Sequence, residues 1–303
     1  MGTHIPVLLK ETIEVLAVKA GGRYVDGTLG RAGHAKEIIA RGGKVLGIDR
    51  DGQALREIGD VAGLTVAKGR HGDMRGIAEE RGWSEVDGVL LDLGVSSPQL
   101  DEPERGFSFL REGPLDMRMD RSDGPSAADL VNGASAESLE GIFRELGEEP
   151  QARRIARAIA KERESKAFKT TTELAVFVER TVGRRGGRHP ATRVFQALRM
   201  EVNDEMGELE RALEGGLGLL KPGGRFAVIA FESLTDRMVK RFFAAHAGKM
   251  AALQQGGERW EGVAPRVRPV TRGAVVASEG EMELNPRSRS ARLRGVEKER
   301  EQP

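Results

Sequence analysis

Residues 23–34 read RYVDGTLGRAGH, a short apolar segment that ends in an aspartate and a glycine-rich turn. Glycines at such a place let the backbone approach a ligand closely. The helix expected over residues 33–40 begins with N–H groups that have no partner inside the helix. This arrangement is typical of the nucleotide-binding turn of doubly wound folds, although a purely structural turn is the alternative. The spacing is not G-x-G-x-x-G, so a nicotinamide dinucleotide is not favoured.

Apolar segments of strand length alternate with helical segments on both sides of this turn. That alternation predicts a parallel sheet with crossover connections, a doubly wound Rossmann-like α/β fold. The same rhythm returns near the C-terminus, after a helix stop and turn over residues 220–224. Strands are expected over residues 23–26, 44–49, 64–67, 86–92, 224–231, 267–271 and 290–296.

The strand pattern is interrupted between its fourth and fifth strands. Residues 98–129 are rich in Gly, Pro, Ser and Asp and predict an ordered loop. Helical periodicity follows, and a single long helix is expected from about residue 194 to residue 220. The predicted organisation is an α/β sheet domain over 1–100 and 201–303, with a mostly helical inserted domain over 101–200.

Charge is distributed unevenly, although the formal net charge is only +1. Asp101 to Glu149 holds 13 acidic and 5 basic residues, whereas Gln151 to Arg199 holds 4 acidic and 13 basic residues. A concentrated basic surface can contact phosphates even in a neutral chain, and a solvated helical face is the alternative.

Several classes of protein and site are disfavoured by composition. The chain has no Cys, which excludes disulfides and thiolate metal sites, and its five His residues lack metal-ligand spacing, so no metal is expected. No apolar run reaches the roughly 18–20 residues that cross a bilayer, and the first residues do not look like a signal peptide. A cytoplasmic protein without membrane contact is expected.

Aspartates end three of the predicted strands, at Asp26, Asp49 and Asp92. The carboxyl ends of strands next to a topological switch point are where such sheets bind ligands. Asp49 is placed to accept both hydrogen bonds of a ribose diol, with a helix N-cap as its alternative role.

Longer runs carry a family resemblance that covers nearly the whole chain. The chain resembles the bacterial small-subunit ribosomal RNA cytosine-N4 methyltransferases, which use S-adenosylmethionine. The matching runs are HIPVLL at 4–9, DGTLGRAGH at 26–34, LDLGVSSPQ at 91–99, RGFSF at 105–109, GPLDMRMD at 113–120, HPATR at 189–193, FQALR at 195–199 and NPR at 285–287.

The resemblance implies a methyltransferase domain with an inserted helical domain that holds RNA. It implies that the turn contacts S-adenosylmethionine, that Asp49 holds the ribose, and that a residue after the third strand packs on the adenine, here Met74. The cofactor residues it implies are Gly30, Ala32, Gly33, His34, Asp49, Met74, Asp92 and Gln99.

The resemblance also implies that a target cytidine amino group is held by the loop that leaves Asp92. The amino lone pair of cytosine is delocalised, so an acceptor for its N–H is needed, and Asp92 is the candidate catalytic residue. A strand-end cap or a cofactor contact is the alternative role. Phe107 and Phe109 could stack on a base or pin a loop to the core. Candidate contacts to 16S RNA in the 30S particle are Arg184, Arg185, Arg188, His189, Arg193 and Arg199.

The chain departs from the family pattern at three places. Ala32 stands where Gly is usual, Met74 where an aromatic residue is usual, and Glu232 where the family has His. A non-catalytic ribosome-assembly factor that retains the fold is therefore kept as an alternative, and a nucleotide-dependent oxidoreductase as a weaker one. The sequence leaves a homodimer open.

Overall fold

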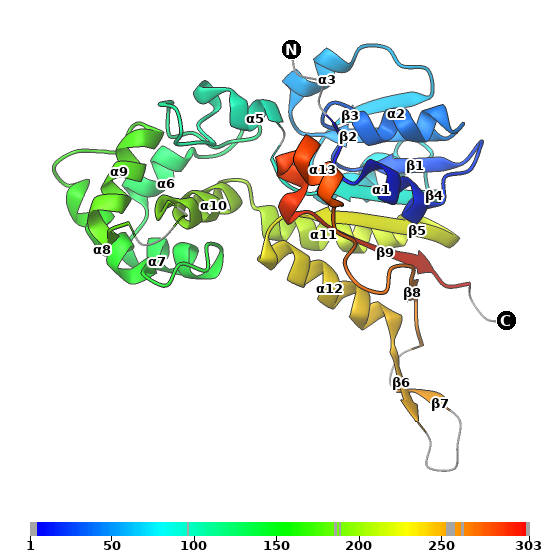
Figure 1. The fold of residues 1–303 in the computed structure, drawn as a ribbon. Helices are drawn as coiled ribbons and strands as arrows, with labels where there is room; N and C mark the ends of the chain where they lie inside the picture. Colours follow the sequence, from blue (N-terminus) through cyan, green and yellow to red (C-terminus); the bar gives the residue numbers. More distant parts are fainter. Residues whose placement is uncertain are drawn as a thin grey trace. The chain divides into compact units, whose positions relative to one another are not determined.

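The computed structural model describes residues 5–95, 97–184, 187, 189–252, 258–261 and 264–300. Contacts within the chain divide it into two compact units (Figure 1). Unit 1 comprises Met1–Gly94 and Gly207–Pro303, and unit 2 comprises Val95–Met206. Each unit is built around hydrophobic cores of its own.

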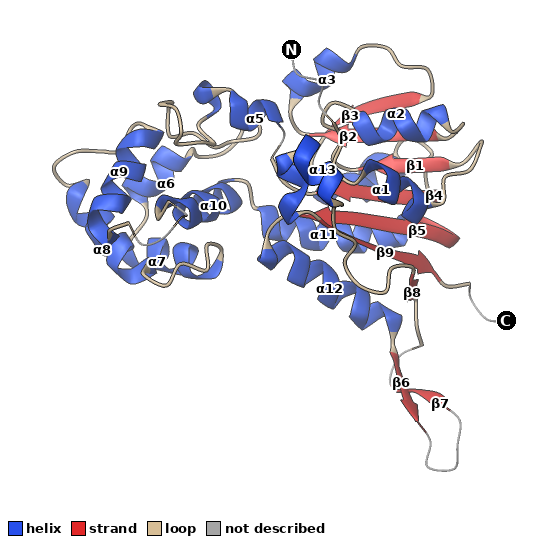
Figure 2. Cartoon of the chain, viewed as in Figure 1, coloured by secondary structure: helices blue, strands red, loops and turns tan. Residues whose placement is uncertain are grey.

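Unit 1 contains a seven-stranded sheet of order β3-β2-β1-β4-β5-β9-β8 (Figure 2). Strands β1 to β5 run parallel to their neighbours, whereas β9 lies antiparallel to β5 and to β8. The order confirms the predicted doubly wound, Rossmann-like sheet, with the antiparallel tail at one side. The strands are β1 Arg23–Asp26, β2 Lys44–Asp49, β3 Leu64–Lys68, β4 Val86–Asp92, β5 Leu220–Ala230, β8 Val267–Pro269 and β9 Arg292–Lys298.

Both faces of the sheet are covered, which explains why its central strands are apolar throughout. In β4, Val89 and Leu91 enter one core together with α4, α11 and α12. Leu90 points the other way, into a core shared with α1 and α2. A parallel strand buried on both sides reads as a continuous hydrophobic run, as observed here.

The helices of unit 1 connect and flank these strands. They are α1 Leu9–Leu16, α2 Gly33–Ala40, α3 Gly52–Ile58, α4 Met74–Glu79, α11 Glu205–Leu219, α12 Ser233–Ala247 and α13 Glu279–Leu284, with 3₁₀ turns η1 His71–Asp73 and η3 Pro286–Ser290. A separate two-stranded pair is formed by β6 Lys249–Ala252 and β7 Glu258–Glu261. No helix in the described part of the chain is long and apolar enough to cross a membrane.

Unit 2 is helical, as its periodicity predicts. Its core gathers buried side chains of α6 to α10 together with the loop residues Leu115 and Met117. Ser126 and Thr170 begin α6 and α9 with reciprocal capping boxes, which satisfy exposed N–H groups at the helix starts. The elements are α5 Ser97–Asp101, η2 Pro103–Arg105, α6 Ala127–Gly133, α7 Ala136–Glu145, α8 Ala152–Glu162, α9 Thr171–Val182 and α10 Ala191–Val202.

The prediction of one long helix over 194–220 is wrong. Helix α10 ends at Val202 and α11 begins at Glu205, because Asp204 adopts a positive φ of 48° that no α-helix accommodates. The Asn203 side chain fixes the break by donating to the carbonyl of Met117 at 2.8 Å. The last residue of the predicted helix, Leu220, already pairs with β4.

The loop expected over 98–129 is less irregular than predicted. It contains α5 and η2, and its last residues already belong to α6. Pro98 lies inside the first turn of α5, where a missing N–H costs nothing, so reading this proline as a loop signal was wrong.

Candidate functional site

Three aspartates come together at one edge of the sheet in unit 1. Asp26, Asp49 and Asp92 are the last residues of β1, β2 and β4, and β1 lies between the other two strands. Because the strands are parallel, their carboxyl ends meet at the same edge. The chain winds outward in opposite directions from β1 and β4, so this edge holds the topological switch point where doubly wound sheets bind ligands.

The glycine-rich turn after β1 is bonded to both neighbouring strands. The Gly27 N–H donates to the carbonyl of Leu90 at 2.9 Å, and the Leu29 N–H donates to that of Ile48 at 3.0 Å. Gly30 has a φ of 51°, and a Cβ built there would meet no heavy atom closer than 3.9 Å. The turn is therefore held rigidly while its tip stays open to a ligand.

Asp49 supports this turn with both of its carboxylate oxygens. Oδ2 accepts the Gly30 N–H at 2.8 Å, and Oδ1 accepts the Asp51 N–H at 2.9 Å. Burial raises the pKa of Asp49. The alternative role of helix cap falls to Asp51, whose Oδ1 accepts the Ala54 N–H of α3 at 3.4 Å. Each oxygen of Asp49 retains a lone pair for a ligand hydroxyl.

Thr28 joins the ends of β1 and β4. Its Oγ1 accepts the Asp92 N–H at 2.6 Å and lies 3.4 Å from Oδ1 of Asp26, which also accepts the Thr28 N–H at 3.1 Å. Burial raises the pKa of Asp26 to about 7. Burial, and then the nearby charge of Asp26, raise the pKa of Asp92 to about 7 as well. Both carboxyl groups therefore titrate near neutral pH.

The charge of this edge suits a cationic ligand. Within the described part of the chain, no Lys or Arg forms an ion pair with Asp26, Asp49 or Asp92. A positive charge brought next to a buried carboxylate favours its ionised form. Together with the open tip at Gly30, the carboxylates fit a nucleoside that carries a sulfonium group.

His34 lies in the first turn of α2 and faces Asp92. Its Nε2 is 3.0 Å from the carbonyl oxygen of Val7, and because a carbonyl only accepts, this nitrogen carries the hydrogen. Nδ1 is thereby left 3.8 Å from Oδ2 of Asp92. Pro6 packs so closely on Gly33 that a Cβ at that glycine would overlap it, which accounts for a glycine there.

The N-terminal segment beside α2 is held by residues near the other end of the chain. The Leu8 N–H donates to Oε1 of Glu281 at 2.7 Å, across 273 positions of sequence. Asn285 Nδ2 donates to the carbonyl of Ile5 at 3.1 Å. The sequence singled out residues 4–9 and 285–287 only as matching runs, and the structure shows that Ile5 of the first run is hydrogen-bonded to Asn285 of the second.

Met74 and His71 both lie next to the glycine-rich turn: a Cβ built on Gly27 would be 3.2 Å from Met74 Cε and 3.5 Å from His71 Cβ. The Met74 side chain is 0% exposed in a core of unit 1, so it offers no free surface to an adenine ring in this structure. Its predicted contact with the adenine stays a prediction. Burial lowers the pKa of His71 to about 4, so its ring is neutral at pH 7, and its buried Nε2 has no hydrogen-bond partner in the described residues.

Glu208 fixes the turn that carries His71. It is 1% exposed and accepts from the Gly72 N–H at 3.0 Å, from Arg70 at 3.2 Å and from Arg211 at 2.8 Å. Burial alone would raise the pKa of Glu208, but these donors lower it. Neither His71 nor Glu208 has a sequence pattern that marks it, because 136 positions separate Gly72 from its partner.

Glu232 follows β5 directly and so lies at the same edge of the sheet as Asp92. It occupies the N-cap position of α12, and its carbonyl accepts from the Thr235 hydroxyl at 2.9 Å. Its side chain is half-buried. The structure thus places a carboxylate at the position where the resembling family has His.

Gln99, the remaining predicted cofactor residue, lies in α5 of unit 2 and is 6% exposed.

Of the two aromatic residues in the RGFSF run at 105–109, Phe107 is 7% exposed. Phe109 packs edge-on against Phe195, with ring centroids 4.8 Å apart. Both therefore pin the loop to unit 2, which confirms the structural alternative for them.

Two of the predicted RNA contacts have structural roles instead. Arg199 Nε and Nη2 bind both carboxylate oxygens of Glu205 at 2.8 and 2.9 Å, and the Arg199 side chain is 11% exposed. His189 Nδ1 accepts the Ala191 N–H at the start of α10, and its Nε2 lies 3.3 Å from Glu179. Both residues lie in runs that match the resembling family, but the sequence of those runs does not show that the two side chains bind partners within the chain.

Of the other four predicted RNA contacts, two lie within the described residues and two do not. Arg193 is exposed on α10 and forms no ion pair in the described part of the chain. Arg184 is 62% exposed and lies 3.7 Å from Glu179. Arg185 and Arg188 lie outside the described residues.

Comparison with known proteins gives a family and close relatives. The model of the MraW methylase family matches residues 1–299. A protein of Acidiphilium cryptum called "Ribosomal RNA small subunit methyltransferase H" is 47% identical over 98% of this chain and 97% of its own. Proteins of the same name from Symbiobacterium thermophilum and Parvibaculum lavamentivorans are 47% and 48% identical over 97% of this chain, and over 96% and 89% of their own.

Proposed function

Because the chain belongs to the MraW methylase family, we propose that it transfers a methyl group from S-adenosylmethionine to the exocyclic N4 amino group of a cytidine in the decoding region of 16S ribosomal RNA. Relatives that match nearly the whole chain carry the name of a small-subunit ribosomal RNA methyltransferase. The observation that carries the proposal is that the carboxylates of Asp26, Asp49 and Asp92 meet at the switch point without an ion pair to Lys or Arg in the described part of the chain. A methylase family match argues against an oxidoreductase.

The cofactor is held by the turn and by the strand ends around it. Asp49 accepts the ribose hydroxyls while it keeps the Gly30 N–H, and Gly30, Ala32, Gly33 and His34 form the floor beneath the ligand. His71 joins Met74 as a candidate to pack on adenine, because both lie next to Gly27, the His71 ring is neutral and Met74 is enclosed. Gln99 completes the set by family resemblance.

The carboxylates of Asp92 and Asp26 provide negative charge beside the positively charged sulfonium group. Bound S-adenosylmethionine supplies a methyl group on a sulfonium that departs as a neutral thioether. Asp92 in its ionised form accepts the N–H of the cytidine amino group, which frees the nitrogen lone pair to attack the methyl carbon. The proton lost by the amino group passes to this carboxylate or to water. His34 restrains the Asp92 side chain from the opposite side.

The RNA partner is assigned to unit 2 and to the small ribosomal subunit. Arg184, Arg185, Arg188 and Arg193 neutralise phosphates, a role that Arg199 and His189 no longer share. The target base must be unstacked to reach the methyl group. The substrate is the 30S particle, and a cytoplasmic location follows from it. A homodimer stays a prediction.

Transfer of labelled methyl groups to small subunits that lack the modification tests the proposal. Mapping the labelled nucleotide by nuclease digestion and mass spectrometry identifies the base and the position on it. Label on N4 of a cytidine in the decoding region supports the proposal, and label on another base or position contradicts it. Binding to the subunit without any transfer would support the non-catalytic assembly factor instead, with Asp92→Asn as the matched inactive control.

A further inference from the structure

Helix α8 has two chemically different faces. Its inner face is apolar and packs in the core of unit 2 through Ala152, Ile155, Ala156 and Ile159. Its outer face carries Arg153, Arg157 and Lys161, all exposed. These three residues, called here the α8 ridge, follow one another at intervals of four positions and so lie along one side of the helix.

The charges of the α8 ridge are not neutralised within the protein. Like charges four residues apart repel and destabilise a helix, and a carboxylate at that spacing is the usual remedy. None of the three forms an ion pair in the described part of the chain. The neighbouring Arg154 donates to the neutral amide of Gln151 at 3.4 Å and forms no ion pair with any described residue. The ridge is therefore an uncompensated row of cations.

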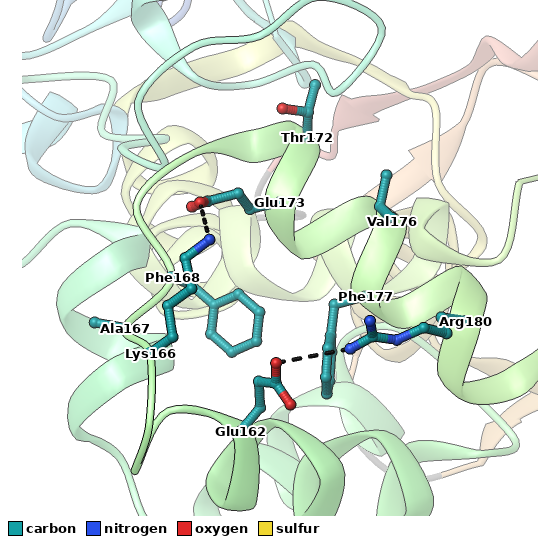
Figure 3. A pocket seen from close by; sticks show the side chains of 9 residues that line it. All are labelled: Glu162, Lys166, Ala167, Phe168, Thr172, Glu173, Val176, Phe177 and Arg180. Carbon is teal, nitrogen blue, oxygen red and sulfur yellow. Dashed lines mark ion pairs between the residues drawn. The ribbon is translucent and has the colours of Figure 1, made fainter.

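Several other exposed cations of unit 2 form ion pairs with carboxylates, which the ridge residues do not in the described part of the chain. A pocket of about 370 Å³ opens between the end of α8 and α9 (Figure 3). There Lys166 pairs with Glu173 at 2.8 Å, and Arg180 pairs with Glu162 at 3.6 Å. On α7, Arg144 pairs with a carboxylate one turn away, at 3.2 Å.

We propose that the α8 ridge binds the phosphate backbone of the RNA substrate, an inference that rests on the proposed function because it takes RNA as the partner. Three residues spaced by four span roughly 12 Å along a helix. A nucleic-acid duplex presents a phosphate every roughly 1.7 Å of its axis, so several phosphates lie within that reach. Guanidinium groups match phosphate oxygens two at a time. Such contacts fix orientation and carry no sequence information.

The test uses the full chain with Arg153, Arg157 and Lys161 changed together to Ala. Binding to protein-free small-subunit ribosomal RNA is titrated between 50 and 200 mM salt. Each lost phosphate contact removes about 0.7–0.9 from the slope of log affinity against log salt, so the slope falls by about 2–3. The loss of affinity across that range becomes roughly 20- to 40-fold smaller. In transfer assays on small subunits, KM rises, whereas kcat and the cofactor Kd stay unchanged.

Two further variants make the result decisive. Arg153→Lys, Arg157→Lys and Lys161→Arg together keep the charge and must keep the wild-type slope, which separates charge from folding. Arg144→Ala, Lys166→Ala and Arg180→Ala together remove three paired cations from the same unit and should leave the slope nearly unchanged. An Ala variant of the ridge that folds and keeps the wild-type slope overturns the inference, as does an equal loss in the paired-cation variant.

Failure of the proposed function would look different. RNA binding is measured without methyl transfer, so a wild-type protein that binds RNA with a ridge-dependent slope but transfers no methyl group contradicts only the proposed reaction. A wild-type protein that methylates small subunits, with a ridge that does not affect the slope, contradicts only this inference.

Discussion

The hydroxyl of Thr28 accepts a hydrogen bond from the backbone N–H of Asp92 at 2.6 Å. This bond ties the glycine-rich turn to the end of β4, so the part that holds the cofactor and the candidate catalytic carboxylate move together. We expect Thr28→Val to leave the Asp92 N–H without a partner and to lower the free energy of unfolding by about 1–3 kcal/mol. Urea unfolding measures this loss, and Thr28→Ser, which keeps the hydroxyl, should restore most of it.

Asp49→Ala should weaken cofactor binding by roughly 10- to 100-fold, because hydrogen bonds to a charged group contribute about 1.5–3 kcal/mol. The ribose loses its acceptor and the Gly30 N–H loses its support. Calorimetric titration with S-adenosylhomocysteine gives the affinity. Asp51→Ala removes a cap of α3 but no acceptor of the Gly30 N–H, and should leave the affinity close to that of the wild type. Equal losses in both variants would contradict the ribose assignment.

Cofactor affinity should increase as pH rises toward and through 7. The pKa values of Asp26 and Asp92 are raised to about 7 by burial, and a cationic ligand favours their ionised forms. Binding therefore releases protons below pH 7, and the affinity changes by up to about tenfold per pH unit for each proton released. Calorimetry in buffers of different ionisation enthalpy counts these protons. Asp92→Asn should release fewer, and an unchanged count would contradict the contribution of Asp92.

The same pKa values affect the stability of the ligand-free protein in the opposite direction. An acid with a raised folded pKa stabilises the fold fully below its unfolded value, near 4, and loses that contribution as pH rises to about 7. The free energy of unfolding should therefore fall across pH 4–7 from this source. Chemical unfolding of the wild type and of Asp26→Asn at several pH values isolates the contribution of Asp26 to the free energy of unfolding, since the amide cannot titrate.

Ala32→Gly should stabilise the protein by about 0.5–1 kcal/mol. Ala32 has a φ of 60°, a left-handed conformation that strains any residue with a Cβ, while glycine adopts it freely. Thermal unfolding measures the gain. Ala35→Gly, in the regular part of α2, is the matched change and should destabilise the protein, because glycine there loses helix propensity and packing. The same sign for both variants would contradict the strain at Ala32.

Arg199→Ala should reduce stability rather than RNA binding. Its guanidinium is nearly buried against Glu205, and removing one partner of such a pair costs roughly 3 kcal/mol. Arg193→Ala, on the exposed side of the same helix, should instead leave stability unchanged and weaken RNA binding. Urea unfolding and salt-dependent RNA titration distinguish the two. A smaller salt dependence of RNA binding in the Arg199 variant would contradict this prediction and indicate that Arg199 contacts the RNA.

The doubly wound type of sheet and the strand ends could be predicted because they depend on local patterns, whereas the strand order was not predicted. Apolar runs that end in Asp26, Asp49 and Asp92 define the strands, and parallel pairing brings their ends together. The site's remaining contacts depend on distant partners: Glu208 positions the turn of His71 from 136 residues away. No local pattern shows which side chains beside the turn stay accessible and which, like Met74, the core encloses.

The end of the insert shows a second reason why parts of the structure could not be predicted from the sequence. Periodicity continues across Asn203 and Asp204, so a single helix was expected, but one left-handed residue redirects the chain. That bend brings Glu205 back to Arg199, which turns an apparently available arginine into an internal ion pair. A sequence reports which residues can carry charge, whereas the fold decides which charges remain unsatisfied.

The hydrogen bond between Leu8 and Glu281 sets an order of events during synthesis. Leu8 leaves the ribosome among the earliest residues and its segment can already contact α2 through Val7 and His34, yet the Leu8 N–H has no acceptor from α13 until residue 281 follows. The nascent chain can thus complete its sheet order from β1 to β5 before this hydrogen bond forms. A chain that terminates after β5 but before α13 would therefore keep Asp26, Asp49 and Asp92 and lack the acceptor that holds Leu8.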